Sequence, residues 1–169
     1  FPDTYFVDSY TSTNDFIAKA LNNFEKKLTP ELREEIASQG KTIFEVVNLA
    51  SIVEREVPAY ADKKMIADIF LKRLDINMGL QSDATINFIT GKGTTQPSLD
   101  DLETESPYNT YKYRGLPPGP ISSPGIDSIE AVVYPTANPY YFFLTTDEAE
   151  TIYGVTHDDH VENKNKYLR

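Results

Sequence analysis

Residues 42–58 read TIFEVVNLASIVEREVP, and this stretch decides how the chain folds. Thr42 and Glu45 form a T-x-x-E capping box, which is typical of a helix start. Pro58 ends the helix, because the residue before a proline avoids helical backbone angles. At about 100° per residue, the apolar face of this helix centres on Val46, Ala50, Val53 and Val57. The segment therefore predicts an amphipathic helix over residues 43–57.

Two acidic residues, Glu54 and Glu56, lie near the end of this predicted helix, at the edges of its apolar face. Glu56 falls next to Leu49 and Val53. An apolar wall raises the pKa of a carboxyl group, and a general acid that works at neutral pH needs a raised pKa. The alternative is that both acids are solvated and paired with Arg55 or with lysines. Periodicity alone does not separate the two glutamates.

Further helices are expected on both sides of this segment. Thr13 is a possible N-cap for the first of them. Pro30 suits the first position of the second, and Gly40 suits its end. Helical spacing of apolar residues and terminal signals indicate helices over residues 14–28, 30–39, 61–74 and 128–133, and from residue 158 onward. The first half of the chain is therefore predicted to be mainly helical.

The middle of the chain, residues 81–124, is rich in Gly, Pro, Ser, Thr and Asn and has little periodicity. Its tyrosines favour an ordered loop that packs on the domain, and its prolines stiffen the backbone. Residues 140–145 are the clearest strand, and residues 151–155 are expected to pair with it as a hairpin. The expected fold is α+β: a helical lobe packed against an irregular Pro/Gly-rich wall and a small antiparallel sheet.

Composition sets limits on function. The chain of 169 residues suits one domain, here residues 1–169, with 40% hydrophobic and 25% charged residues. Its formal net charge of -10 makes nucleic acid and anionic lipid poor partners. The absence of cysteine excludes thiol nucleophiles, thiolate metal sites and disulfides. No apolar run approaches the roughly 18 residues of a membrane span.

Other candidate sites carry weaker signals. Asp83 follows a helix end, where it is either a second carboxylate of a glycosidase pair or a turn cap. The run 157–160, His-Asp-Asp-His, lacks zinc-site spacing, and its acids suit a helix start, so no metal site is predicted. The two histidines lie too close together near the C-terminus to support a Ser/His/Asp triad. Residues 91–94 lack the spacing of a phosphate-binding loop.

A series of motifs runs in order through almost the whole chain. Its members are FPDTY (1–5), LASIVERE (49–56), IFLKRL (69–74), GLQSDAT (79–85), DLET (101–104), SPYNTY (106–111), GLPPGPI (115–121) and PG (124–125). With these motifs the chain resembles the MltG (YceG-like) family of endolytic lytic transglycosylases. The ordered set is specific, because each motif occurs in its expected place relative to the others.

The resemblance implies that Glu56, the second acid of Ile-Val-Glu-x-Glu, is the catalytic residue. Val57 follows it where other lytic transglycosylases carry Ser or Thr, so that small hydroxyl is absent here. Near the C-terminus Thr151 stands where the family tends to have a His, and His157 is not expected in the site. We expect a cleft wall that orients the sugars to contain Gln81, Ser82, Asp83, Tyr108, Asn109 and Tyr111.

The resemblance also implies a reaction and a location. One glutamate acts as acid and then base, cuts the bond between N-acetylmuramic acid and N-acetylglucosamine, and leaves a 1,6-anhydro end without any cofactor. The implied partners are peptidoglycan glycan strands and cell-wall synthases. The family resemblance places such a domain at the outer face of the bacterial cytoplasmic membrane, behind an N-terminal anchor and a LysM-like lobe. Membrane contact is expected only through that anchor.

Two other functions stay open from the sequence. One is a lysozyme-like hydrolase in which Glu56 is the acid and Asp83 activates water. The other is a non-catalytic module that binds peptidoglycan. The hydrolase predicts reducing sugar ends in place of anhydro ends, and the binding module predicts no cleavage at all.

Overall fold

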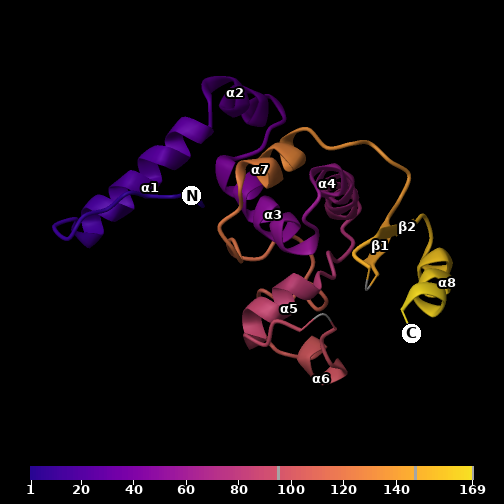
Figure 1. Ribbon diagram of the computed structural model, residues 1–169. Helices are drawn as coiled ribbons and strands as arrows, with labels where there is room; N and C mark the ends of the chain where they lie inside the picture. Colours follow the sequence, from indigo (N-terminus) through magenta and orange to yellow (C-terminus); the bar gives the residue numbers. More distant parts are fainter. Residues whose placement is uncertain (95, 147, 169) are drawn as a thin grey trace.

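The computed structural model describes residues 1–94, 96–146 and 148–168, and it contains mainly helices with one two-stranded sheet (Figure 1). The described elements are α1 (Thr13–Lys27), α2 (Pro30–Ser38), α3 (Ile43–Glu56), α4 (Tyr60–Asp75), α5 (Asp83–Thr90), α6 (Leu99–Leu102), α7 (Ile126–Val133), β1 (Phe142–Thr145), β2 (Thr151–Gly154) and α8 (His157–Tyr167). The α+β prediction is confirmed. Among the described residues, no helix has the length and apolar character needed to cross a membrane.

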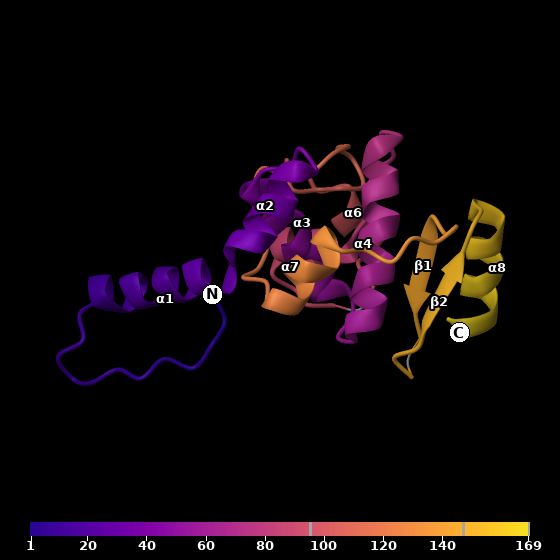
Figure 2. The ribbon, with the colours of Figure 1, turned by 90° about the horizontal axis from the view of Figure 1, so that it is seen from above.

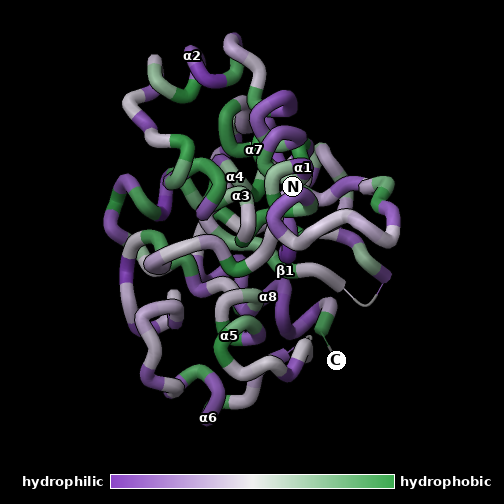
Figure 3. The backbone as a smooth tube through the Cα atoms, turned by 90° about the vertical axis from the view of Figure 1, so that its left-hand side faces the viewer, coloured by the Kyte–Doolittle hydropathy of each residue, from purple (hydrophilic) through white to green (hydrophobic). Residues whose placement is uncertain are grey.

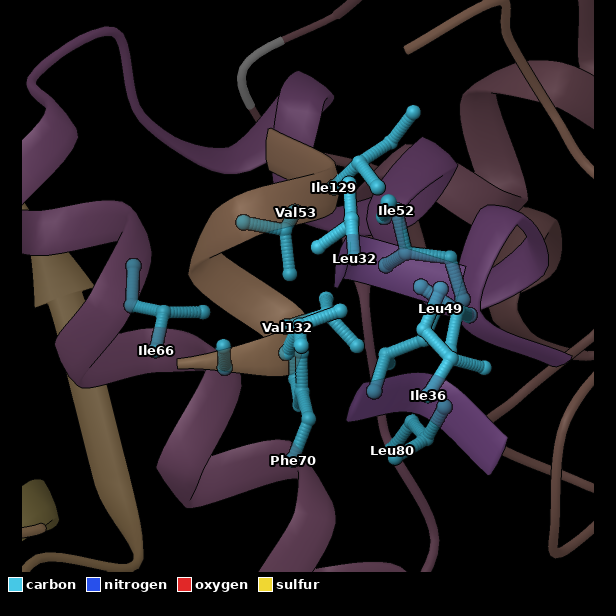
Figure 4. Close-up of a cluster of buried hydrophobic side chains, with 14 of the residues drawn as sticks. Leu32, Ile36, Leu49, Ile52, Val53, Ile66, Phe70, Leu80, Ile129 and Val132 are labelled. Atoms are coloured by element: carbon cyan, nitrogen blue, oxygen red, sulfur yellow. The ribbon is translucent and has the colours of Figure 1, made fainter. Parts of the chain in front are cut away.

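The central element is α3, and it forms as its sequence predicts. Thr42 and Glu45 make the full capping box, and Val57 leaves the helix with extended backbone before Pro58. Helices α2, α4 and α7 pack around it, and its hydrophobic core residues are at most 2% exposed: Val46, Leu49, Ala50, Ile52 and Val53. Figure 4 shows the side chains of these helices meeting in one cluster. In Figure 3 the hydrophobic parts of α3 and α7 lie in the middle of the molecule.

The predicted hairpin is also confirmed, and α4 lies between it and the helical core (Figure 2). Strands β1 and β2 are antiparallel, with Phe142 opposite Gly154. The hairpin attaches to α4 because the Tyr153 hydroxyl donates a hydrogen bond to Asp62 Oδ1 at 2.7 Å. Helix α8 packs on the hairpin, so the sheet joins α8 to α4.

The first helix differs from its prediction at its start. The N-cap is Ser12 and not Thr13, because Ser12 and Asp15 form a capping box that satisfies backbone groups from both sides. None of the residues of α1 is buried. Ile17 is 49% exposed and Leu21 is 61% exposed, although their spacing is that of a buried face. In Figure 2, α1 and the segment before it stand away from the main body.

The middle segment is only partly irregular, so the prediction of a continuous loop is wrong over α5 and α6. The helix α5 buries Ile86, and Gly91 ends it in the left-handed conformation at φ +67°. The rest of the segment forms the expected wall along α3. Asn48 donates to the Pro117 carbonyl at 2.7 Å, and the Ile121 amide donates to Ser51 Oγ at 2.9 Å.

Candidate active site

The partly buried Glu56 ends α3 and points toward the start of α5. Its Oε1 accepts a hydrogen bond from the Ser82 hydroxyl. Burial, with a smaller contribution from the negative charge of Asp83, raises the pKa of Glu56 to about 7. The hydrogen bond from Ser82 and the positive charge of Arg73 oppose this rise. Glu56 is therefore a carboxyl group that gains and loses its proton near neutral pH.

Glu54 has a different environment, although it lies only two positions earlier on the helix. Lys63 Nζ lies 3.1 Å from its Oε2, and the Ser128 hydroxyl and the Gly125 amide also donate to Oε2. Burial favours a higher pKa for Glu54, but the hydrogen bonds from Ser128 and Lys63 outweigh it and hold the pKa below its usual value. Glu54 is thus an ionised carboxylate that joins α3, α4 and α7.

The turn before α5 brings Ser82 to Glu56. Gln81 adopts a left-handed backbone with φ +49°, which is uncommon for a residue with a side chain. Its amide donates to the Thr110 carbonyl at 3.1 Å. The Ser82 amide donates to Thr110 Oγ1 at 3.0 Å, and this hydroxyl also lies 2.9 Å from Thr85 Oγ1. Thr110 therefore fixes the unusual turn from the wall side.

Asp83 and Tyr111 add a second carboxyl group to the site. The Tyr111 hydroxyl donates to Asp83 Oδ1 at 2.5 Å. Burial raises the pKa of Asp83, while the hydrogen bond from Tyr111 and the charge of Lys164 lower it. Burial raises the pKa of Tyr111 well above its usual value, and the hydrogen bond to Asp83 adds to this rise, so the phenol keeps its proton. Asp83 is the first residue of α5, and Ser82, which precedes it as N-cap, makes no side-chain capping hydrogen bond.

Arg73 is a component of the site that the sequence reasoning missed. Its side chain is only 5% exposed, and it donates to the Leu80 carbonyl at 2.6 Å and to the Tyr141 carbonyl at 2.8 Å. Burial lowers its pKa to about 10, and the charge of Glu56 opposes that fall. An arginine three positions after Phe70, on the buried side of α4, was the available signal.

The chain is similar to known proteins along nearly its whole length. The profile of the YceG-like family matches residues 1–166. The chain belongs to the YceG-like family. It is also similar to a crystal structure of a yceG-like protein from Listeria monocytogenes, with a TM-score of 0.89 and 35% identity, covering 96% of this chain and 53% of that one. The resemblance predicted from the ordered motifs is confirmed.

Curated proteins named endolytic murein transglycosylase are similar to this chain. The protein from Bacillus subtilis (strain 168) is 36% identical, over 99% of this chain and 47% of the relative. The protein from Streptococcus pneumoniae serotype 2 (strain D39 / NCTC 7466) is 36% identical, over 96% of this chain and 30% of the relative. The chain thus spans about half or less of the length of these relatives.

Within this YceG-like site, the predicted residues separate into two groups. Ser82 contacts Glu56 directly, and Asp83 and Tyr111 form the neighbouring carboxyl–phenol pair. Gln81 supplies the turn directly before Ser82 and Asp83 and is itself exposed. The hydroxyl that Val57 lacks is supplied to Glu56 by Ser82, which lies 26 residues further along the chain.

Tyr108 and Asn109 lie in the wall and make other contacts. The Asn109 amide is buried and donates to the carbonyls of Leu102 and Thr104 at 2.8 and 2.9 Å, so its donors shape the wall. The Tyr108 ring packs on Phe88 with 4.9 Å between centroids. No contact between either side chain and Glu56 is found among the described residues.

The His-Asp-Asp-His run has a structural explanation. Asp159 completes the capping box of α8 with Thr156. The rings of His157 and His160 both lie against Phe142, with centroids 5.9 and 5.5 Å away. In the part of the chain that the structure describes, no group of three or more His, Asp or Glu side chains is arranged to hold a metal ion.

Proposed function

We propose that residues 1–169 form the catalytic domain of an endolytic lytic transglycosylase that cuts peptidoglycan glycan strands. The observation that carries this proposal is Glu56, whose burial raises its pKa to about 7. Among the described residues it has no ion-pair partner, in contrast to Glu54. The relatives named endolytic murein transglycosylase support the substrate class.

The reaction needs one carboxyl group that acts twice. Protonated Glu56 donates its proton to the glycosidic oxygen between N-acetylmuramic acid and N-acetylglucosamine, and the bond from that oxygen to C1 breaks. The C6 hydroxyl of the muramic acid then attacks C1 and gives its proton to the Glu56 carboxylate. The products are a 1,6-anhydro end and a free 4-hydroxyl, and no water is consumed. A pKa near 7 suits both proton transfers.

The neighbouring residues hold Glu56 and shape the cleft. The Ser82 hydroxyl orients the Glu56 carboxyl group through its hydrogen bond. Asp83, held by Tyr111, places a second carboxyl near the sugar, where its negative charge stabilises positive charge that develops at C1. Gln81, Tyr108 and Asn109 belong to the wall that positions the strand. Arg73 keeps the turn before Ser82 in place through the Leu80 carbonyl.

The test is product analysis by mass spectrometry on purified glycan strands, with wild type beside Glu56→Gln. Wild type should release internal fragments with 1,6-anhydro ends. Glu56→Gln should lose at least about 100-fold in rate, because a positioned acid–base group contributes about 10²–10⁴-fold. The variant should still fold, since glutamine keeps the size of the side chain and can accept the Ser82 hydrogen bond. Near-normal turnover by Glu56→Gln would refute the assignment of Glu56.

The same experiment separates the two other functions. The proximity of Asp83 to Glu56 favours a hydrolase as the second candidate. A hydrolase leaves reducing ends that are one water heavier, and Asp83→Asn should then remove activity as completely as Glu56→Gln. A binding module would retain strands without cutting them and would be indifferent to both substitutions.

The substrate implies where such a protein works. Peptidoglycan strands lie outside the cytoplasmic membrane, so the proposed site of action is the bacterial cell envelope at the outer face of that membrane. Cell-wall synthases are the proposed protein partners, because they supply the strands. Cross-linking in growing cells, followed by identification of the captured proteins, tests this part of the proposal.

A further inference from the structure

The ring of Phe142 on β1 connects α8 to the candidate active site. On one side the Arg73 guanidinium lies 5.3 Å from the ring centroid. On the other side the His160 ring stacks on Phe142, with 5.5 Å between centroids and 27° between planes. Arg73 in turn binds the Leu80 carbonyl, directly before the turn that carries Ser82. These contacts fix α8 at one side of the active-site residues.

The face of α8 that meets Phe142 also carries a lysine. His160 and Lys164 are four residues apart and therefore lie on one side of the helix. Lys164 is exposed and forms no ion pair with any described residue. Its positive charge acts on Asp83 and lowers the pKa of that carboxyl, so α8 brings a cation near the active-site residues. Burial lowers the pKa of His160, so Lys164 supplies the cation on this face at neutral pH.

We propose that Lys164, held in place by the stacking of His160 on Phe142, binds a carboxylate that the muramic acid carries on its lactyl group or its stem peptide. This inference rests on the proposed function, since it names the part of the substrate that α8 recognises. Arg73 donates to two backbone carbonyls and lies against Phe142, whereas Lys164 on α8 has no ion-pair partner among the described residues.

Charge balance supports this role. The chain carries a formal net charge of -10, and two of its carboxyl groups, Glu56 and Asp83, lie at the site itself. An acidic stem peptide is repelled by such a surface unless a cation meets it. The transglycosylase cut is made at a muramic acid, so the lactyl group of that sugar lies close to Glu56 during the reaction. The charge of Lys164 already acts on Asp83, so Lys164 lies near enough to the site to meet what the lactyl group carries.

The experiment measures binding without cleavage, in the Glu56→Gln background of the full chain. Three ligands of equal glycan length are titrated: strands with stem peptides, amidase-stripped strands with free lactyl carboxylates, and chitin oligosaccharides without carboxylates. Lys164→Met should weaken binding of a carboxylate-bearing ligand about five-fold, the upper range for an exposed ion pair. Chitin binding should not change. The ligand that loses affinity identifies the carboxylate involved, and the loss should fade at high salt.

Lys166→Met is the matched control, because Lys166 is on the same helix but lies over the ring of Tyr167, 4.7 Å from its centroid. This substitution should leave all three affinities unchanged. The proposal is overturned if Lys164→Met leaves all three affinities unchanged or weakens chitin binding as much as binding of the carboxylate-bearing ligands. It is also overturned if Lys166→Met causes the same loss of affinity as Lys164→Met. Failure of all carboxylate-bearing ligands to bind overturns it as well. Product analysis of the wild type tests the proposed cleavage separately, so the two failures are distinguishable.

Discussion

At the scale of single residues, two glutamates on one helix have opposite electrostatic environments. Glu54 meets Lys63 and two further donors, which favour its charge. Glu56 meets one hydroxyl in partly buried surroundings, which disfavour its charge. Two positions along a helix correspond to about 200° of rotation. The pair therefore shows how neighbours on different elements, and not residue type, decide which acid is ready to exchange a proton.

Replacing Glu56 with Gln should stabilise the protein at high pH. The pKa of Glu56 is about 7 in the folded protein and 4.5 in the unfolded chain. Between these pH values the unfolded chain loses the Glu56 proton more readily than the folded protein does, so the free energy of unfolding falls as the pH rises from 4.5 to 7. Glutamine does not ionise, so Glu56→Gln removes this pH-dependent loss of stability. Relative to wild type it should gain roughly 1–3 kcal/mol above pH 7 and little below pH 4.5. Urea unfolding at both pH values measures this, and an equal change at both would contradict the raised pKa.

Replacing Glu54 with Gln should have the opposite effect on stability. Lys63 is only 7% exposed and would lose its carboxylate partner. We expect a loss of about 1–3 kcal/mol in the free energy of unfolding at pH 7, reduced because Glu54 is partly exposed. Product analysis of the folded variant should still show anhydro ends at a near-normal rate. Loss of cleavage in a fully folded Glu54→Gln would mean that Glu54 belongs to the catalytic machinery.

At the scale of elements, Arg73 joins three parts of the chain. It comes from α4, donates to Tyr141 just before β1, and donates to Leu80 just before the turn into α5. Its guanidinium also lies over Phe142. A planar, multi-donor cation suits this role because it satisfies two carbonyls that point from different directions. Arg73 therefore links the position of the hairpin to that of the active-site turn.

Arg73→Met should loosen that junction. Methionine keeps much of the side-chain volume but leaves the Leu80 and Tyr141 carbonyls without their donor, so the free energy of unfolding should fall by about 2 kcal/mol or more. Hydrogen exchange should accelerate in β1, β2 and α8 more than in α2. Arg73→Lys should recover only part of the loss, because an ammonium lacks the fork geometry. Unchanged protection of the hairpin amides would contradict this role.

At the scale of the whole molecule, the core and the periphery differ in how much surface they bury. Helices α3, α4 and α7 enclose most of the large buried side chains. Helix α1 has no buried residue and stands apart from them (Figure 2). Few buried contacts leave a helix dependent on its own hydrogen bonds, and a helix of this length is marginal in water.

Hydrogen exchange should reflect this difference along the chain. Amides of α1 should exchange through local opening, and the free energy of this opening should be a small fraction of that of global unfolding. Amides of α3 should exchange only through global unfolding. Mass spectrometry of peptides from the native protein would measure both in one experiment. Equal protection of α1 and α3 would mean that α1 is stabilised by contacts that this structure does not contain.

Local signals made much of the fold predictable. The Thr42–Glu45 box, the apolar face of α3 and the aromatic-rich run at residues 140–145 act over a few residues, so the central helix and the hairpin follow from the sequence. The start of α1 was misplaced by one residue, because adjacent Ser12 and Thr13 both suit an N-cap. Helix α5 was missed, because eight residues carry too little periodicity to stand out in a Pro- and Gly-rich region.

The sequence by itself determined the family, the central helix and the pair of candidate acids. The family motifs favoured Glu56 over Glu54, but only the tertiary structure gave the two acids their different surroundings, placed the Ser82 hydroxyl against Glu56 and added Arg73 to the candidate site. The physical reason is that a carboxyl pKa depends on burial and on nearby charges and donors. Those neighbours lie far away in the chain: Ser82 is 26 residues from Glu56, and Ser128 is 74 residues from Glu54. Folding brings them together, and helix periodicity contains no information about them.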